Sequence, residues 1–321
     1  MMEYLPADQH IDYLTPVPNV FQVQHFGVPD VDRESWTLRV GGLVNRELEI
    51  AVADLVKLPL REVTAFHECA GSPIHPHIPQ RRVANIKWTG VPLGVLLDEA
   101  GVDKKARYVL SRGADGGTWQ HMRHSAYEKD LPLSKARSPS VLLAVAMNDA
   151  ALPIDHGGPV RLVVPGFYGT NSTKWLRSIS LSPMRSTGAF TTKYYTDREM
   201  VGGVLRETPV WGVAPNSIIV SPGSELAVPG RPIEIWGWCW GEHPISSLEV
   251  STDDGQSWTR AELTTREDFS WQRFGLSWSP VAVGEYHIAS RATDSQGNVQ
   301  PDASRRNRVY KRIVHVRNDR R

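Results

Sequence analysis

The chain has 321 residues, 22% of them charged, and a formal net charge of +1. This balance argues against nucleic acid as the main partner, and no uncharged apolar run approaches the roughly 20 residues of a membrane helix. The segment Met1 to Pro6 lacks a basic and apolar leader, so we expect a cytoplasmic protein. A periplasmic form whose signal had been removed would look the same.

A chain of this length predicts two domains, and the residue pattern changes near residue 205. Residues 1–205 mix both kinds of secondary structure and predict an α+β domain. We expect strands at 36–40, 108–111, 141–145 and 161–166, and short helices at 52–58, 93–100 and 130–136. Apolar residues recur at helical spacing over 93–100, and Gly101 ends that pattern.

Residues 206–321 predict an all-β domain. Strands are expected at 217–221, 232–240, 248–251 and 286–292, with turns at 253–255 and 294–298. Short strands separated by regular turns indicate an immunoglobulin-like sandwich without the usual cysteine pair. Trp236, Trp238 and Trp240 alternate along one strand, so we expect their shared face to form the sandwich core or a subunit interface.

Cys69 is one of only two cysteines in the chain. It follows an alternating stretch and precedes Ala70, Gly71, Ser72 and Pro73, which predicts a thiol at the end of a strand, facing a loop. With no partner nearby, a disulfide is not expected. The thiol is a buried structural group, a nucleophile or a thiolate ligand to a soft metal.

A second candidate site spans residues 155–175. His156 and Arg161 precede a turn with small polar residues and Lys174. Exposed backbone amides together with these basic groups can hold a phosphate. The alternative is a hairpin with a few solvated charges.

Histidines are concentrated in the first domain, where they include His25, His67, His75, His77, His121, His124 and His156. The pairs His67-x-Cys69 and His75-x-His77 raise the possibility of zinc, but zinc sites usually have cleaner ligand spacing. Hydrogen-bonded loop residues or contacts to a cofactor are the simpler interpretation. Arg273 stands between aromatic residues, which predicts either a side chain that reaches a neighbouring pocket or a surface cation–π contact.

Three segments carry a resemblance that covers residues 16–316. They are Glu68-Cys69-Ala70-Gly71, the pattern from Met147-Asn148-Asp149 to Lys174-Trp175-Leu176, and Gly237-Trp238-Cys239-Trp240-Gly241 with the following Val250 to Trp258. In these segments the chain resembles the sulfite oxidase family of molybdenum-molybdopterin oxidoreductases. The resemblance implies a molybdopterin-binding domain at 1–205 and an immunoglobulin-like dimerisation domain at 206–321.

The resemblance also implies roles for individual residues. Cys69 would be the metal ligand and, with Tyr195 (or Tyr194), part of the catalytic set; Arg273 is added to that set because of its aromatic neighbours and not because of the resemblance. The implied cofactor-binding residues are Phe21, His25, Cys69, Ala70, Asp115, His156, Arg161, Gly169, Asn171, Ser172, Thr173 and Lys174.

Two positions depart from the family pattern. Val23 and Ile74 stand where family sulfite oxidases have arginines that bind the substrate anion. Each such donor is worth about 1.5–3 kcal/mol. Arg81, Arg82, Arg123 and Arg273 are candidates to replace them; without a replacement, a neutral or monoanionic substrate is favoured.

The implied function is two-electron oxygen-atom transfer on a small molecule at an oxo-molybdenum centre, with sulfite to sulfate as the family default. One alternative is an S-oxide or N-oxide reductase with the same cofactor; another is a cofactor-free binding protein that uses the sandwich. No haem-binding Cys-x-x-Cys-His is present, so we expect no haem and a separate electron-transfer partner such as a cytochrome. The fold analogy favours a homodimer. The basic residues after 304 are expected to form a solvated strand face or to dock an acidic electron carrier.

Overall fold

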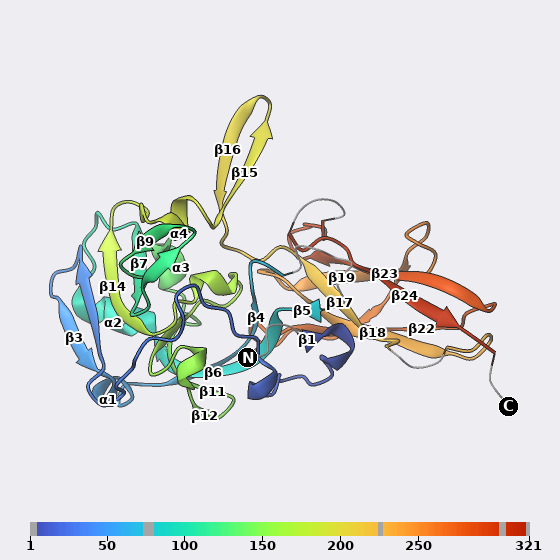
Figure 1. Cartoon of the computed structure of the whole chain (residues 1–321), viewed down its shortest axis with the longest axis horizontal. Coiled ribbons are helices and arrows are strands. Elements are labelled where there is room, and N and C mark those ends of the chain that lie inside the picture. The colour runs from blue at the N-terminus through green and yellow to red at the C-terminus, as the bar shows by residue number, and fades with distance from the viewer. Residues whose placement is uncertain (1–4, 73–79, 224–226, 302–305, 319–321) are drawn as a thin grey trace. The chain divides into compact units, whose positions relative to one another are not determined.

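The structure, a computed structural model, describes residues 5–72, 80–223, 227–301 and 306–318 (Figure 1). The chain forms two compact units, and each is described by itself. The central unit comprises residues 22–63 and 87–211, and the sandwich unit comprises residues 1–21, 64–86 and 212–321. Each unit is made of several separate stretches of the chain, so the predicted boundary after residue 205 stays a prediction.

The central unit is built on a five-stranded sheet with strand order β10-β7-β14-β2-β3. The strands are β2 (Thr37–Gly42), β3 (Leu48–Ala51), β7 (Tyr108–Gly113), β10 (Glu128–Pro132) and β14 (Leu176–Ser182). Strand β14 runs parallel to β2, and the other neighbouring pairs are antiparallel. Alternation buries Leu38 and Val40 completely in the core of this unit, as the sequence pattern predicts.

A second sheet has the order β12-β11-β6-β4, and β13 also pairs with β11. Its strands are β4 (Arg61–Glu68), β6 (Val83–Pro92), β11 (Leu142–Met147), β12 (Ala150–Ala151) and β13 (Arg161–Val163). Strands β4 and β6 each begin in one unit and end in the other. The pairing of Leu143 with Leu162 fixes β13 in register, so Arg161 begins a strand that is buried throughout.

The helices are short: α1 (Val52–Leu55), α2 (Leu93–Ala100), α3 (Leu133–Ala136) and α4 (Ala189–Thr192), with 3-10 turns η1 (Ala7–Gln9), η2 (Val17–Asn19), η3 (Ile154–His156) and η4 (Gly169–Asn171). The helix at 93–100 is confirmed, and Gly101 ends it with a left-handed φ of 68°. The helix predicted at 52–58 ends at Leu55. Within the described residues, no helix is both long and apolar enough to cross a membrane.

The helix predicted at 130–136 is wrong in its first half. Residues up to Pro132 belong to β10, which pairs with β7 along its whole length. Lys129, Asp130 and Leu131 are fully buried there, so tertiary pairing decides the local conformation. The helix α3 begins only after Pro132. Pro132 is the N-cap residue, and its ψ of 140° is extended and not helical.

Two hairpins extend the central unit. One joins β8 (Gly117–Trp119) to β9 (Met122–His124), and the other joins β15 (Thr196–Val201) to β16 (Val204–Pro209). Figure 1 shows the β15–β16 hairpin as a two-stranded arm. Gly202 and Gly203 form its turn with φ values of 58° and 82°, a conformation that suits glycine. Apolar side chains near the tip are solvent-exposed, with Met200 at 67% and Val204 at 70%.

The sandwich unit has two four-stranded sheets, with orders β17-β18-β22-β21 and β20-β19-β23-β24. The strands are β17 (Asn216–Ser221), β18 (Ile233–Trp240), β19 (Ile245–Ser251), β20 (Thr259–Arg260), β21 (Glu262–Leu263), β22 (Gln272–Trp278), β23 (Gly284–Asp294) and β24 (Lys311–Val316). A short pair, β1 (Leu5–Pro6) and β5 (Gln80–Arg81), completes the unit. The α+β domain followed by an immunoglobulin-like sandwich is therefore confirmed, in a mostly β structure.

The tryptophans of β18 do not form the sandwich core. The opposite face of the strand, with Ile235 and Cys239, packs into that core. Trp238 instead stacks on Trp271 with ring centroids 4.8 Å apart, and its indole N–H donates to the backbone carbonyl of His10 at 2.6 Å. The expectation of a shared face holds; Trp238 on this face packs on the N-terminal segment of the same unit, and a role of the face in a subunit interface stays a prediction.

Candidate functional site

Three basic side chains meet in the central unit at the ends of three elements. His156 ends η3, Arg161 begins β13, and Lys174 precedes β14. The Arg161 Nη1 atom donates to the His156 carbonyl at 2.9 Å. The Lys174 ammonium contacts the carbonyl of Asp155 at 3.4 Å and Oε1 of Gln24 at 3.3 Å. The second candidate site from the sequence is thus a cluster of basic groups, which we call the basic cluster.

Two strained turns hold the basic cluster together. Gly157 has a φ of 102°, and a Cβ there would lie 2.7 Å from Cγ of Lys174, so only glycine fits. Trp175 has a φ of 47° and is fully buried. Its indole N–H donates to the Ile154 carbonyl at 2.8 Å and its backbone N–H to the Gly157 carbonyl at 3.0 Å. Lys174 is therefore fixed beside the turn that carries His156.

The basic cluster is electrostatically suited to an anion. Burial, and after it the charge of Arg161, lowers the pKa of Lys174 to about 7. Burial, Arg161 and Lys174 lower the pKa of His156 to about 4. Burial also lowers the pKa of Arg161 to about 10. A bound phosphate would offset this mutual repulsion, so these residues fit the phosphate of a pterin cofactor.

Asp115 lies near the same cluster. Burial raises its pKa to about 6, and the charge of Lys174 opposes that rise. Its Oδ1 atom is buried without a hydrogen-bond partner among the described residues. An acceptor left in this state suits a ligand that brings N–H groups, as a pterin ring does.

The small residues of the turn before Lys174 use their side chains internally. The Asn171 amide donates to the carbonyls of Tyr168 (3.0 Å) and Val210 (2.9 Å). Ser172 Oγ accepts from the backbone N–H of Val164 at 3.1 Å, and the Thr173 hydroxyl lies 2.7 Å from that of Ser111.

Gly169 begins η4 in this turn. The side chains of Asn171, Ser172 and Thr173 therefore support the turn through these hydrogen bonds, and a contact of the turn with a cofactor stays a prediction.

His25 lies in an aromatic cage of the central unit. Its ring centroid is 4.8 Å from those of Trp119 and Phe190 and 5.4 Å from that of Tyr127, which it stacks upon. The Tyr195 hydroxyl lies 3.0 Å from His25 Nε2. Burial, and after it the charge of Lys174, lowers the pKa of His25 to about 4. The imidazole is therefore neutral at pH 7.

The sequence left Tyr194 and Tyr195 as alternatives, and only Tyr195 reaches His25. The Tyr194 hydroxyl is buried without a hydrogen-bond partner within the described part of the chain. The Lys129 ammonium lies 5.3 Å from the centroid of the Tyr195 ring. This geometry favours Tyr195 as the tyrosine of the site.

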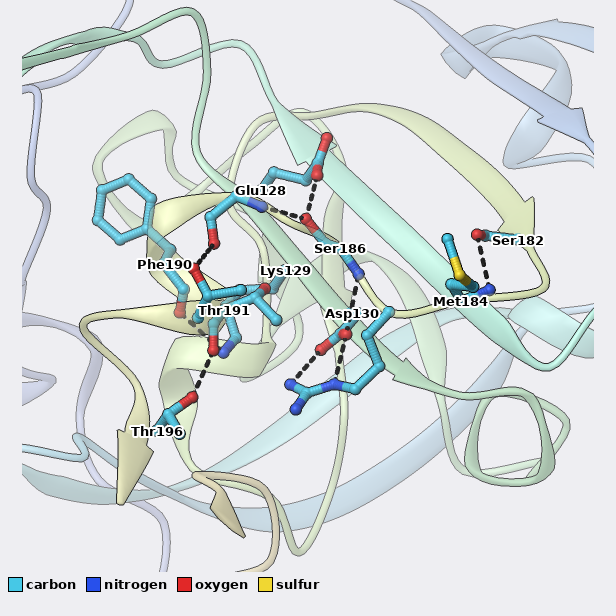
Figure 2. Close-up of polar contacts among 12 residues, drawn as sticks. Glu128, Lys129, Asp130, Ser182, Met184, Ser186, Phe190, Thr191 and Thr196 are labelled. Carbon is cyan, nitrogen blue, oxygen red and sulfur yellow. Dashed lines mark hydrogen bonds and ion pairs between the residues drawn. The ribbon is translucent and has the colours of Figure 1, made fainter. Parts of the chain in front are cut away.

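Polar contacts around β10 and α4 fix the segment that leads to Tyr195 (Figure 2). The buried Lys129 donates to the Phe190 carbonyl at 3.1 Å, and the Thr196 hydroxyl donates to the Thr191 carbonyl. The carboxylate of the next residue, Asp130, accepts a hydrogen bond from Arg185 Nε at 2.8 Å. The buried Lys129 therefore holds the backbone at Phe190, ahead of this tyrosine, and Thr196, which follows the tyrosine, is tied back to Thr191.

Sequence reasoning missed Tyr127, Phe190 and Lys129. Tyr127 stacks on His25, and its hydroxyl donates to the Thr170 carbonyl at 2.7 Å. A lysine in the stretch Glu128-Lys129-Asp130 resembles a solvated charge, and no local pattern shows that it is fully buried.

A cavity of about 220 Å³ opens in the central unit beside this aromatic cage. Its lining includes Arg112, Arg123, His124, Glu128 and Phe190. Arg112 donates to the Ser125 hydroxyl at 2.8 Å, and Glu128 accepts from Ser186. Arg123, one candidate replacement for the missing arginines, therefore lines a cavity together with a second arginine.

The other candidate replacements lie in the sandwich unit. The Arg81 guanidinium is buried 4.5 Å from the Tyr310 ring centroid. Arg82 follows β5. Arg273 pairs with Glu234 at 2.9 Å and lies 4.8 Å from the Trp236 ring centroid, which is the surface cation–π arrangement. A catalytic role for Arg273 stays a prediction.

Cys69 directly follows β4 in the sandwich unit, as the sequence predicts for a thiol at a strand end. Its backbone N–H donates to the Arg82 carbonyl at 2.9 Å, and the Gly71 N–H donates to its sulfur at 3.4 Å. Neither Cys69 nor Cys239 forms a disulfide. Burial raises the pKa of Cys69, against the Gly71 donor, which favours the protonated thiol; a metal held by this sulfur would displace the proton.

The residues around Cys69 are closely held within the same unit. Phe21 stacks on His67 with ring centroids 5.5 Å apart. The carbonyl of the buried Ala70 accepts from Arg306 Nε at 2.7 Å. Glu68 is fully buried and burial raises its pKa to about 8, although Trp240 and Asn216 donate to it. A free sulfur in a fixed loop fits the role of a metal ligand.

Some sequence candidates fall outside the described residues, namely Ile74, His75 and His77. Among the described residues there is no group of three or more His, Cys, Asp and Glu side chains that could hold a metal ion. That part of the chain therefore gives the zinc interpretation no support.

Comparisons with known proteins agree with this chemistry. Residues 25–190 match the oxidoreductase molybdopterin binding domain, and residues 207–313 match the Mo-co oxidoreductase dimerisation domain. The chain is 32% identical to the sulfite oxidase of Gallus gallus, over 91% of this chain and 69% of that protein. It is 27% identical to a nitrate reductase [NADH] of Brassica napus, over 93% of this chain and 37% of that protein.

The crystal structure of the sulfane dehydrogenase SoxCD from Paracoccus pantotrophus superposes with a TM-score of 0.84 at 29% identity, over 98% of this chain and 86% of that one. The chain spans 58% of the length of the human mitochondrial sulfite oxidase. The molybdopterin-binding match implies a molybdenum–molybdopterin cofactor. The chain belongs to the sulfite oxidase family of molybdopterin oxidoreductases.

Proposed function

We propose that this oxidoreductase catalyses two-electron oxygen-atom transfer on a small sulfur oxyanion, with sulfite as the first substrate to test. The basic cluster carries the proposal, because burial and the charge of Arg161 disfavour the charged forms of Lys174 and His156 when no anion is present. A cofactor phosphate supplies the missing negative charge. When bound, the oxo-molybdenum group supplies the oxygen atom and accepts two electrons.

In this proposal each named residue has a distinct task. Cys69 binds the metal through its sulfur, and the basic cluster holds the phosphate. The neutral His25 and its partner Tyr195 form a pair that can hold a proton at His25 Nε2. The aromatic rings around His25 exclude water from that pair.

Val23 stands where family sulfite oxidases have an anion-binding arginine, so another group must supply positive charge toward an anionic substrate. We propose that Arg123, supported by Arg112 in the cavity of the central unit, supplies positive charge toward an anionic substrate. The replacement at position 23 also motivates a second candidate, reduction of an S-oxide or N-oxide with the same cofactor. Such substrates are neutral and need no arginine.

The first test is elemental analysis of protein purified from a host that makes the cofactor. We expect close to one molybdenum per chain, and less than about a tenth would contradict the proposal. Steady-state assays with sulfite and a cytochrome acceptor, beside S-oxide reduction with a reduced dye, then separate the two directions. In R123A we expect KM for sulfite to rise about tenfold, the value of one charged hydrogen bond, with R107A as a control on the same unit.

Two further partners belong to the proposal. The match of residues 207–313 to a dimerisation domain supports a homodimer. We also propose a separate electron-transfer protein, such as a cytochrome. Sedimentation of the purified protein and reduction of candidate cytochromes by sulfite test these two points.

A further inference from the structure

The carboxylate of Glu68, next to Cys69 in the chain, is held by the sandwich. Its Oε1 accepts from the Asn216 amide at 2.8 Å, and its Oε2 accepts from the Trp240 indole N–H at 2.9 Å. Glu68 has no exposed surface. Both donors lie on strands of the C-terminal sandwich, β17 and β18. The residue before the proposed metal ligand is therefore anchored to residues about 150 or more positions away in the sequence.

The other side of Cys69 is anchored to the same region. The Ala70 carbonyl accepts from Arg306 Nε at 2.7 Å, and Arg306 precedes β24. Its neighbour Asn307 is fully buried and donates to the Ala214 carbonyl at 3.0 Å. The loop that carries Cys69 is thus tied to the sandwich on both sides of the sulfur.

Further hydrogen bonds fix the residues that hold this loop. The Asn216 Oδ1 atom accepts from the Ser217 backbone N–H at 2.9 Å and from the Gln300 amide at 3.2 Å, and Gln300 donates to the Asn307 carbonyl at 3.2 Å. A side chain whose own amide is fixed in this way has little freedom to follow a moving partner. The contacts form one connected network from β17 to the segment before β24.

We propose that Asn216, Trp240 and Arg306 are positioning residues that set the geometry of the Cys69 sulfur at the metal. The proposal rests on the proposed function, because it takes Cys69 as the ligand. It gives the C-terminal domain a task besides dimerisation: its strands hold the metal-binding loop. Outer partners of metal ligands commonly influence affinity and activity by about 10–100-fold.

The test uses the full chain with its cofactor and the variants W240F and R306A. Phenylalanine keeps most of the aromatic packing but removes the N–H donor, whereas alanine at 306 removes a partly buried contact with little effect on the core. W258F is the matched control, because Trp258 lies in the same sandwich and stacks on Arg291. We expect a shifted or broadened Mo(V) electron paramagnetic resonance signal in both variants at unchanged metal content, and an unchanged signal in W258F.

A second readout does not need the metal. In full-length protein from a host that cannot make the cofactor, we expect the Cys69 thiol of W240F and R306A to react with a thiol reagent about tenfold faster than in wild type, which corresponds to the loss of one hydrogen bond. Cys239 is buried in the sandwich core and serves as an internal reference.

The outcomes separate the two proposals. Wild type without molybdenum would overturn the proposed function. Wild type with molybdenum, but with the same signal and thiol rate in W240F and R306A as in W258F, would overturn the positioning role.

Discussion

The two units bury titratable side chains in opposite ways. In the central unit, Lys174, Arg161 and His156 lie together. Burial lowers the pKa of all three, and the charge of Arg161 further lowers the pKa of Lys174 and His156. In the sandwich unit, the buried Glu68 is surrounded by neutral N–H donors that satisfy both of its oxygens. The first arrangement gains from an added anion, whereas the second is complete without a ligand. This difference separates residues that we propose bind a cofactor from residues that stabilise the fold.

The largest effect is expected for C69S. Loss of a ligand should exceed the roughly 10–100-fold cost of losing an outer partner, so we expect activity to fall more than about 100-fold. Because the basic cluster is intact, phosphate-bearing pterin should remain bound while the metal is lost. Pterin fluorescence after oxidation and metal analysis of the same sample check this. C239A is the control; loss of pterin together with metal in C69S would contradict the separation of roles.

A pair of substitutions contrasts the two units directly. E68A leaves two buried donors without their acceptor, so we expect the free energy of unfolding to fall by about 2–4 kcal/mol. K174M removes an ammonium group whose charge is disfavoured by burial and by Arg161, so the cofactor-free protein should lose no stability.

Urea unfolding of cofactor-free protein measures both variants, and pterin content should fall only in K174M. Equal destabilisation by the two changes would remove the contrast between the units.

The pH dependence of stability offers a finer comparison. The pKa of Lys174 is about 7 in the folded chain against an ordinary value of 10.5, so between these pH values the unfolded state binds more protons. Stability of the cofactor-free protein should therefore rise with pH in this window, by about 1 kcal/mol from pH 7 to pH 8. Urea unfolding at the two pH values checks the sign. K174M should lose this part of the slope, and an unchanged slope would show that Lys174 is not the group that titrates.

Local patterns in the sequence predicted much of the framework, and long-range contacts account for the rest. The helix at 93–100 follows from apolar spacing and Gly101 alone. In contrast, the strand at 128–132 depends on pairing with β7, and the outward packing of Trp238 depends on a carbonyl of the N-terminal segment. Within the site, Cys69 and the basic residues lie in recognisable sequence motifs, so they could be predicted. The anchoring of Glu68 could not be predicted, because its donors lie far along the chain.

The smallest expected effect decides how one predicted cofactor contact should be understood. The Thr173 hydroxyl is fully buried and bonds the hydroxyl of Ser111, so T173V should cost about 1 kcal/mol of stability and leave pterin content unchanged. S111A removes the same hydrogen bond from the other side and is the matched control. If both variants lose similar stability and keep the cofactor, Thr173 supports the turn. If only T173V loses pterin, its hydroxyl contacts the cofactor, and the basic cluster extends into the turn that the sequence assigned to phosphate.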